Sequence, residues 1–181
     1  MRIISGRWRG RAIAAPAGQA TRPTSDRARE AIFSMLTSRL GSFDGLDVLD
    51  VFAGTGALGL EALSRGAGSA CFIDNDAAAV KAIKANLATL GVTAPVTATV
   101  RQSPVTSLGL APRGHHLVFL DPPYGQRLAG PALAHLGQHG WLAPGALISV
   151  ETAAADSLDT DLELLVERRF GKALVRLLRA P

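Results

Sequence analysis

The sequence contains little of several residue types, and each scarcity excludes a class of protein. One of its 181 residues is cysteine, so an internal disulfide is impossible and a disulfide-stapled secreted domain is excluded. No Cys/His cluster has zinc-finger spacing, and no run of about 18 apolar residues predicts a membrane-spanning helix. The opening MRIISGR is charged where a signal peptide needs a long apolar stretch. We therefore expect a cytoplasmic protein without a metal or a membrane anchor.

The apolar content suffices for one compact domain. Hydrophobic residues make up 48% of the chain and charged residues 19%. These proportions suit a buried core and exclude intrinsic disorder. The length lies within the range of a single domain. We expect a monomer.

The net charge of +4 hides an uneven distribution of charge. Residues 1–29 hold seven arginines and one acid, residues 30–167 hold seven bases and fourteen acids, and residues 168–181 hold five bases and no acid. Clustered arginines bind phosphate and release counterions from a polyanion. Residues 7–11, RWRGR, interleave an aromatic ring with bases, as nucleic-acid surfaces do. Such a segment is either an RNA-binding arm or a solvated tail, and Trp8 either stacks on a base or pins the arm to the domain.

The N-terminal segment is expected to precede the main fold. Residues 1–14, with turns at Gly6 and Gly10, predict a small β-hairpin or an extended arm. A helix follows from an N-cap at Thr24 or Ser25, with apolar residues at helical spacing between positions 28 and 36. Arg27 and Arg29 are expected off this apolar stripe. The prediction is a basic arm over residues 1–20 and one domain over residues 21–181.

Short apolar runs alternate with helical patterns over the rest of the chain. Strands are predicted over 46–52, 69–74, 95–101, 117–121 and 146–151, with helices over 57–65, 77–90 and 131–139. This alternation predicts an α/β fold, a mostly parallel sheet with helices on both faces. Two further runs, 162–170 and 173–178, predict an antiparallel C-terminal hairpin that brings the sheet to seven strands.

The first predicted strand leads into a glycine-rich loop, DVFAGTGALG over residues 50–59. Ligands of such sheets bind at the carboxyl ends of the strands, where these glycines let the backbone approach a ligand. The pattern GxGxxG with Asp74 twenty residues after Gly54 also fits a nicotinamide or flavin enzyme. Asp50 favours S-adenosylmethionine instead, because a carboxylate there can bind the methionine ammonium but would repel a pyrophosphate. Asp74 would then bind the ribose hydroxyls.

A second strand end carries the sequence DPPY over residues 121–124. The two prolines fix the backbone and leave carbonyl groups available as acceptors. Asp121 and the Pro122 carbonyl can accept from one exocyclic amine, so that its lone pair faces an incoming methyl group. Tyr124 offers a ring on which the base can stack. Catalysis would then depend mostly on positioning, with Asp121 stabilising positive charge on nitrogen.

These motifs together resemble one family. RIISG over residues 2–6, TRPTSDR over 21–27, REAIF over 29–33, the glycine loop and DPPY are similar to the bacterial 16S rRNA guanine-N2 methyltransferases of the RsmD type. The resemblance implies a Rossmann-like methyltransferase domain with an N-terminal β-hairpin that grips RNA. It also implies S-adenosylmethionine as cofactor and a guanine of 16S rRNA, within the 30S subunit or an assembly intermediate, as substrate.

The candidate site residues fall into three groups. The catalytic candidates are Asp121, Pro122 and Tyr124. The cofactor candidates are Asp50, Phe52, Gly54, Thr55, Gly56, Asp74, Asn75 and Ser103; the last departs from the family, which usually has Gly-Asp where this chain has Gln102-Ser103. The RNA candidates are Arg2, Arg7, Trp8, Arg9, Arg11, Arg22 and Arg27. The alternatives are an adenine-N6 or cytosine-N4 methyltransferase, an NAD-dependent oxidoreductase, and a nucleic-acid-binding module with a decayed site.

Overall fold

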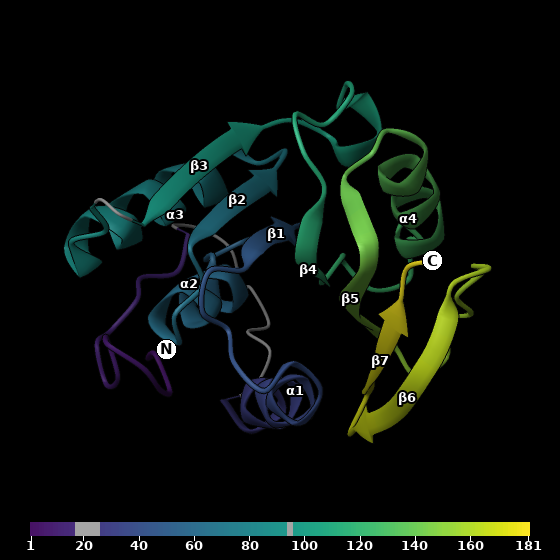
Figure 1. The fold of residues 1–181 in the computed structure, drawn as a ribbon, viewed down its shortest axis with the longest axis horizontal. Coiled ribbons are helices and arrows are strands. Elements are labelled where there is room, and N and C mark those ends of the chain that lie inside the picture. Colours follow the sequence, from purple (N-terminus) through teal and green to yellow (C-terminus); the bar gives the residue numbers. More distant parts are fainter. Residues whose placement is uncertain (17–25, 94–95) are drawn as a thin grey trace.

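A computed structural model describes residues 1–16, 26–93 and 96–181, and its centre is one seven-stranded sheet. The strand order is β3-β2-β1-β4-β5-β7-β6 (Figure 1). Strands β1 to β5 run parallel, and β7 pairs antiparallel with β5 and β6. The strands are β1 (Asp47–Val51), β2 (Ser69–Asp74), β3 (Thr97–Gln102), β4 (His115–Leu120), β5 (Leu142–Ala153), β6 (Glu163–Phe170) and β7 (Ala173–Arg179). The predicted architecture, mostly parallel with an antiparallel C-terminal hairpin, is confirmed.

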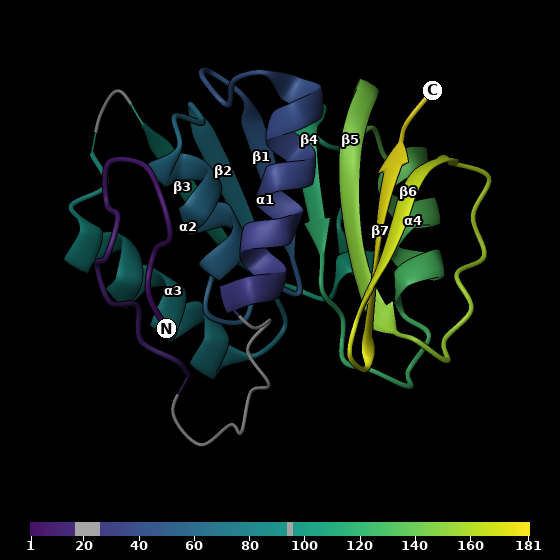
Figure 2. The ribbon, with the colours of Figure 1, turned by 90° about the horizontal axis from the view of Figure 1, so that it is seen from below.

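Helices cover both faces of the sheet, as the alternating pattern predicted. One apolar cluster joins the sheet to α1, α2 and α3, and a second joins its other face to α4 and the short helix η1 (Figure 2). The helices are α1 (Asp26–Leu40), α2 (Ala57–Ser64), α3 (Ala77–Leu90), η1 (Val105–Ser107) and α4 (Ala129–Gln138). None of the described helices is long and apolar enough to cross a membrane.

The predicted and observed ends of helices agree best where the sequence contains helix-capping residues. Helix α3 spans its predicted residues because Asp76 accepts the Ala78 N–H at its start, and Gly91 ends it with a left-handed backbone. Helix α4 begins two residues before the predicted Pro131, since proline is tolerated in a first helical turn. The predicted caps Thr24 and Ser25, and the predicted strand start at Pro95, lie outside the described residues.

Strand β5 is longer than predicted. It begins at Leu142, where that residue pairs with His115, and an irregularity in register follows before Leu117 pairs with Leu147. Because of this irregularity, the first residues of β5 do not follow a strict alternation of apolar and polar positions, and the sequence pattern did not include them in the strand. Strand β5 therefore spans 12 residues, and Glu151 lies near its carboxyl end.

The N-terminal arm folds back on itself as a small antiparallel hairpin, in which Arg2 and Ala12 form a bridge and the Ile3 and Ile13 N–H groups donate to the carbonyl oxygens of Arg11 and Met1. It runs beside α2 and α3 (Figure 2). Gly6 has a φ of +81°, and a Cβ atom there would lie 1.9 Å from the Ser64 carbonyl oxygen. Only glycine permits this approach. The arm is thus fitted closely to the domain, and its predicted boundary at residue 20 lies outside the described residues.

Candidate active site

The strand order reverses between β1 and β4, where a cavity of about 400 Å³ opens at the carboxyl ends of the strands. Such a switch point is where open α/β sheets bind ligands. The glycine loop after β1, the end of β2, the DPPY segment after β4 and the end of β5 all line it. The two strand ends singled out in the sequence therefore face one space.

The contacts of Gly59 explain why the loop motif ends in a glycine. A Cβ atom there would lie 2.4 Å from Cε1 of Phe72 and 3.1 Å from Oδ2 of Asp50. The Gly59 N–H also donates to Asp50 Oδ2 at 2.8 Å. Glycine at this position lets the start of α2 pack on β2 and hold the Asp50 carboxylate.

Asp50 is buried, with 2% of its surface exposed, and lines the cavity. Burial raises its pKa well above the ordinary value; the Gly59 N–H opposes this shift, and the charges of Asp121 and Asp74 add to it. A buried carboxylate that resists ionisation is stabilised in its charged form by a cation. Asp50 is therefore suited to a ligand ammonium.

We expect Asp50→Asn to stabilise the free protein near neutral pH. Because the pKa of Asp50 is raised in the folded state, the folded protein holds this proton more tightly than the unfolded chain. Its contribution to stability therefore falls as the pH rises from about 3.9, the unfolded value, through the folded pKa. Asparagine keeps an oxygen for Gly59 and carries no charge. Thermal unfolding at several pH values should show a melting temperature above wild type at pH 7.5, with the difference narrowing toward pH 4. A constant difference would contradict this assignment.

Asp74 joins the glycine loop to the end of β2. Its Oδ2 accepts the Gly54 N–H at 2.8 Å, and its Oδ1 accepts the Asp76 N–H at 2.9 Å. Phe52, which precedes the loop glycines, has a φ of 59°, a strained backbone for a bulky residue. Asp74 thus fixes the shape of the loop as well as lining the cavity.

The DPPY segment is anchored through its tyrosine. The Tyr124 hydroxyl donates to Oε1 of Glu151 at 2.6 Å, and the Glu151 side chain is buried at the end of β5. The hydrogen bond connects the loop after β4 to the neighbouring strand and fixes the tyrosine ring against the cavity. The Tyr124 hydroxyl therefore has a structural partner that the sequence did not reveal.

Tyr124→Phe should lower the free energy of unfolding by more than the loss of an exposed hydroxyl would. The variant removes a donor from a buried carboxylate, a loss worth about 1–3 kcal/mol. We expect a corresponding fall in the free energy of unfolding measured in urea, and a partial loss of turnover as the ring is freed. Tyr124→Ala, which also removes the ring, should abolish turnover. Equal stability of wild type and Tyr124→Phe would show that the hydrogen bond to Glu151 makes no net contribution to the free energy of unfolding.

Nine of the eleven catalytic and cofactor candidates line the cavity, and two do not. Asp50, Phe52, Gly54, Thr55, Asp74, Asn75, Asp121, Pro122 and Tyr124 line it. Gly56 and Ser103 are not among the lining residues, and the Ser103 hydroxyl donates to the Pro104 carbonyl oxygen. No group of three or more His, Cys, Asp or Glu side chains within residues 1–16, 26–93 and 96–181 could hold a metal ion.

Sequence reasoning missed several lining residues, among them Glu151 and Arg29. Glu151 ends a predicted strand, so the strand-end rule that selected Asp50 could have found it. Arg29 was expected off the apolar stripe of α1, yet it is fully buried. Its spacing from Ile32, Phe33 and Leu36 is three, four and seven residues, which places it on the buried face of the helix.

The basic arm is clamped to α2. Glu61, fully buried, accepts the Ile4 N–H at 2.7 Å through Oε2 and the Ser5 N–H at 3.0 Å through Oε1. Ser64 Oγ accepts the Trp8 N–H at 3.0 Å. The helix that begins at the glycine loop therefore also holds the arm.

Asn86 of α3 adds a second link. Its Nδ2 donates to the carbonyl oxygens of Ala14 and Thr55, both at 3.0 Å, and its Oδ1 accepts the Ala14 N–H at 2.8 Å. The end of the arm and the glycine loop are thus held by one buried side chain.

Trp8 packs in the core. Its side chain is only 9% exposed and belongs to the apolar cluster beneath α1 and α2. The expectation that Trp8 stacks on a base is not supported, because its ring is already covered by the domain. Of the two roles considered, the structure favours pinning the arm.

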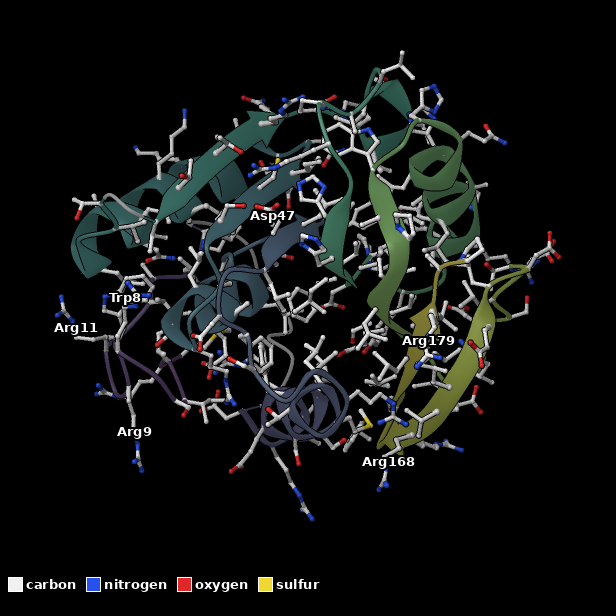
Figure 3. The ribbon with its side chains drawn as sticks, viewed as in Figure 1. Trp8, Arg9, Arg11, Asp47, Arg168 and Arg179 are labelled. Atoms are coloured by element: carbon white, nitrogen blue, oxygen red, sulfur yellow. The ribbon has the colours of Figure 1, made fainter. Side chains whose placement is uncertain are left out.

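The candidate RNA-binding arginines that the structure describes lie at the surface. Arg2, Arg7, Arg9, Arg11 and Arg27 are exposed, and Arg22 lies outside the described residues. Arg9 extends away from the ribbon, and Arg168 and Arg179 lie across the molecule on β6 and β7 (Figure 3). The two basic ends of the sequence are therefore separate surfaces in the fold.

Known proteins resemble the chain over nearly its full length. The family model described as conserved hypothetical protein 95 matches residues 1–179. Ribosomal RNA small subunit methyltransferase D of Escherichia coli K12 is 41% identical over 88% of this chain and 78% of its own. The Haemophilus influenzae protein of the same name is 38% identical, over 98% and 92%.

Solved structures share the fold. The Escherichia coli protein yhhF superposes with a TM-score of 0.84 at 39% identity, covering 99% of this chain and 97% of that one. An RNA methyltransferase from Salinibacter ruber, in complex with S-adenosyl-L-homocysteine, has a TM-score of 0.66 at 17% identity over 88% and 94%, which shows a common fold alone. The chain therefore belongs to the conserved hypothetical protein 95 family and is a relative of the bacterial small-subunit ribosomal RNA methyltransferases D.

Proposed function

We propose that the protein transfers a methyl group from S-adenosylmethionine to the exocyclic N2 amine of a guanine in 16S rRNA. The observation that carries the proposal is the meeting of the glycine loop and the DPPY segment in one cavity. The size of the cavity, about 400 Å³, is that of a small-molecule site. Relatives named as small-subunit rRNA methyltransferases support the substrate class.

The donor groups of the cavity fit the cofactor. Asp50 offers a buried carboxylate for an ammonium, and Asp74 and Asn75 line the same cavity with acceptors suited to ribose hydroxyls. The same acids would repel a pyrophosphate, which disfavours a dinucleotide. When bound, S-adenosylmethionine would supply a methyl group on a sulfonium, whose sulfur takes the C–S electron pair and leaves as a neutral thioether.

The chain's own contribution to the reaction is positioning. The Asp121 carboxylate and the Pro122 carbonyl accept the two N–H groups of the target amine, so that its lone pair faces the methyl donor. Tyr124, held by Glu151, stacks on the base. As the nitrogen forms its bond to carbon it becomes positive, and Asp121 stabilises that charge until a proton leaves to Asp121 or water.

Mapping the product tests the proposal. Mass spectrometry of 16S rRNA from a strain lacking this protein should show one guanine without its N2 methyl group, and expression of the chain should restore it. The same test on free rRNA and on 30S particles identifies the form of the substrate. N6-methyladenosine or N4-methylcytosine as the product would place the protein among other amino-methyltransferases, and tight binding of NAD in calorimetry would favour the oxidoreductase.

The exposed arginines of the arm should carry rRNA affinity. Alanine at Arg7, Arg9 and Arg11 should weaken binding and reduce the dependence of log affinity on log salt by about one unit per lost phosphate contact. The binding constant measured at several salt concentrations gives this slope. Alanine at Arg168, Arg169 and Lys172 is the matched control. If only that second set changed the slope, RNA capture would belong to the C-terminal hairpin.

A further inference from the structure

The loop between β4 and α4 (Figure 1) carries an exposed arginine, Arg127, three residues after Tyr124. Two hydrogen bonds anchor this loop. The Tyr124 hydroxyl donates to Glu151, and the Gly125 N–H donates to a carboxylate on the chain after β5, Oδ2 of Asp156, at 3.1 Å. Three residues of chain span at most about 10 Å. Arg127 is therefore held close to the ring on which the target base is proposed to stack.

The backbone of Arg127 is strained. Its φ is 51°, in the left-handed region that a residue with a Cβ atom seldom occupies. Strained residues of this kind cluster at sites that bind or react with ligands. Within residues 1–16, 26–93 and 96–181, no hydrogen bond or ion pair holds the Arg127 guanidinium. The fold thus gains no polar interaction from this side chain to offset the strain, which points to a partner outside the chain.

Arg127 lines a small hollow that adjoins the cavity. Pro122, Pro123 and Tyr124 line both spaces, whereas Arg127 lines only the hollow. A nucleotide whose base enters the cavity keeps its sugar and phosphate outside. The hollow offers the adjoining surface for that part of the nucleotide.

The charges around both spaces disfavour a phosphate except at Arg127. Arg29 is fully buried, and its Nη2 donates to Arg2 and Asp26, so it presents no charge to RNA. Arg127 is the one exposed basic side chain among the described lining residues. A guanidinium binds phosphate through two parallel hydrogen bonds. The acids that line the cavity and the hollow, and that repel phosphate, are Asp50, Asp74, Asp76, Asp121, Glu151 and Asp156.

We propose that Arg127 binds the phosphate group of the nucleotide whose guanine enters the cavity. This inference rests on the proposed function, in which the base stacks on Tyr124 and its amine meets Asp121. The phosphate contact holds the backbone of that nucleotide beside the loop, so that the base stays against the ring. Arg127 is thus a positioning residue at the mouth of the site, separate from the arginines of the arm.

Methyl transfer to 16S rRNA, measured over a range of rRNA and salt concentrations, tests the assignment. Arg127→Gln should raise the KM for rRNA at least about 10-fold, the scale of a charge-assisted hydrogen bond. The dependence of log affinity on log salt should fall by about one unit, as for one lost phosphate contact. Arg127→Lys keeps the charge and should recover most of the affinity. Arg39→Gln, at an exposed position in the last turn of α1, should behave as wild type.

A glycine variant separates the side chain from the strained backbone. Glycine adopts a positive φ without steric cost, so Arg127→Gly should melt at or above the temperature of wild type. It should nevertheless show the same rise in KM as Arg127→Gln. Both variants should bind S-adenosylhomocysteine as tightly as wild type in calorimetry, because Arg127 does not line the cofactor cavity.

The outcomes separate this inference from the proposed function. If wild type methylated no guanine, both would be overturned. An active wild type together with an unchanged KM and salt dependence in Arg127→Gln would overturn the role of Arg127 alone. A lower melting temperature or a weaker affinity for S-adenosylhomocysteine in both variants would reveal a merely structural role. A change in kcat alone would assign Arg127 to the base and overturn the phosphate contact.

Discussion

Asp121→Ala is expected to lower methyl transfer by at least about a hundredfold, the scale seen when a preorganised charge-stabilising group is removed. Asp121 follows β4, where its N–H lies 3.5 Å from the Val51 carbonyl oxygen, so the carboxylate is held at the junction with β1. Its proposed interaction strengthens as the target nitrogen becomes positive, so the loss should appear in kcat. Single-turnover transfer to 16S rRNA measures it.

Cofactor affinity should survive the same substitution. The charge of Asp121 adds to the raised pKa of Asp50, so its removal eases ionisation of the carboxylate that is proposed to bind the ammonium. S-adenosylhomocysteine should bind Asp121→Ala within a few-fold of wild type. Asp121→Asn, which accepts a hydrogen bond without charge, should retain intermediate activity, and the exposed Asp159→Ala is the control. Near-normal transfer by Asp121→Ala would remove this residue from the mechanism.

Removal of residues 1–14 is expected to destabilise the whole protein. The sequence alone predicted a basic arm over residues 1–20 outside a domain of residues 21–181, and a chain cut at residue 14 would then still fold. The structure buries Ile3, Trp8 and Ile13 in the main apolar cluster. Substitution of one such side chain by alanine costs about 2–5 kcal/mol, against a total stability of about 5–15 kcal/mol. The truncated protein should lose its cooperative thermal transition or melt at least about 10 °C lower.

Two point variants separate packing from charge in the arm. Trp8→Ala should lower the free energy of unfolding by about 3–5 kcal/mol. Arg9→Ala, at an exposed position, should change it by less than about 0.5 kcal/mol. Urea unfolding gives both values. A truncated protein as stable as wild type would show that the arm is a dispensable tail.

The alternation of strands and helices was predictable because it depends on local patterns. A buried parallel strand is a short apolar run, and a helix facing a sheet repeats its apolar residues at helical spacing. Strand β2 and helix α3 were predicted to the residue for this reason. The site motifs were found in the same way, since parallel strands bring their carboxyl ends to one edge. Asp50, Asp74 and Asp121 consequently line one cavity.

The sequence did not predict which side chains are buried in segments that lack regular structure or that mix charged with apolar residues. Trp8 and Arg29 look alike in the sequence, both lying among arginines, and both are buried by partners distant in the chain. Ser103 follows β3 as predicted, but its hydroxyl donates to the Pro104 carbonyl oxygen and does not line the cavity. No local pattern encodes such contacts.

The sequence by itself determined the fold class, the two strand ends that form the site and the presence of a basic arm. Each of these depends on periodicity, turn chemistry or charge within a few neighbouring residues. The tertiary structure alone decided that Glu61 clamps the arm, that Glu151 holds Tyr124 and that Arg29 faces the cavity. These are pairings of buried polar groups across 27 to 57 residues of chain. Their partners are set by packing, because a polar group that loses water must find whichever donor or acceptor the fold brings beside it.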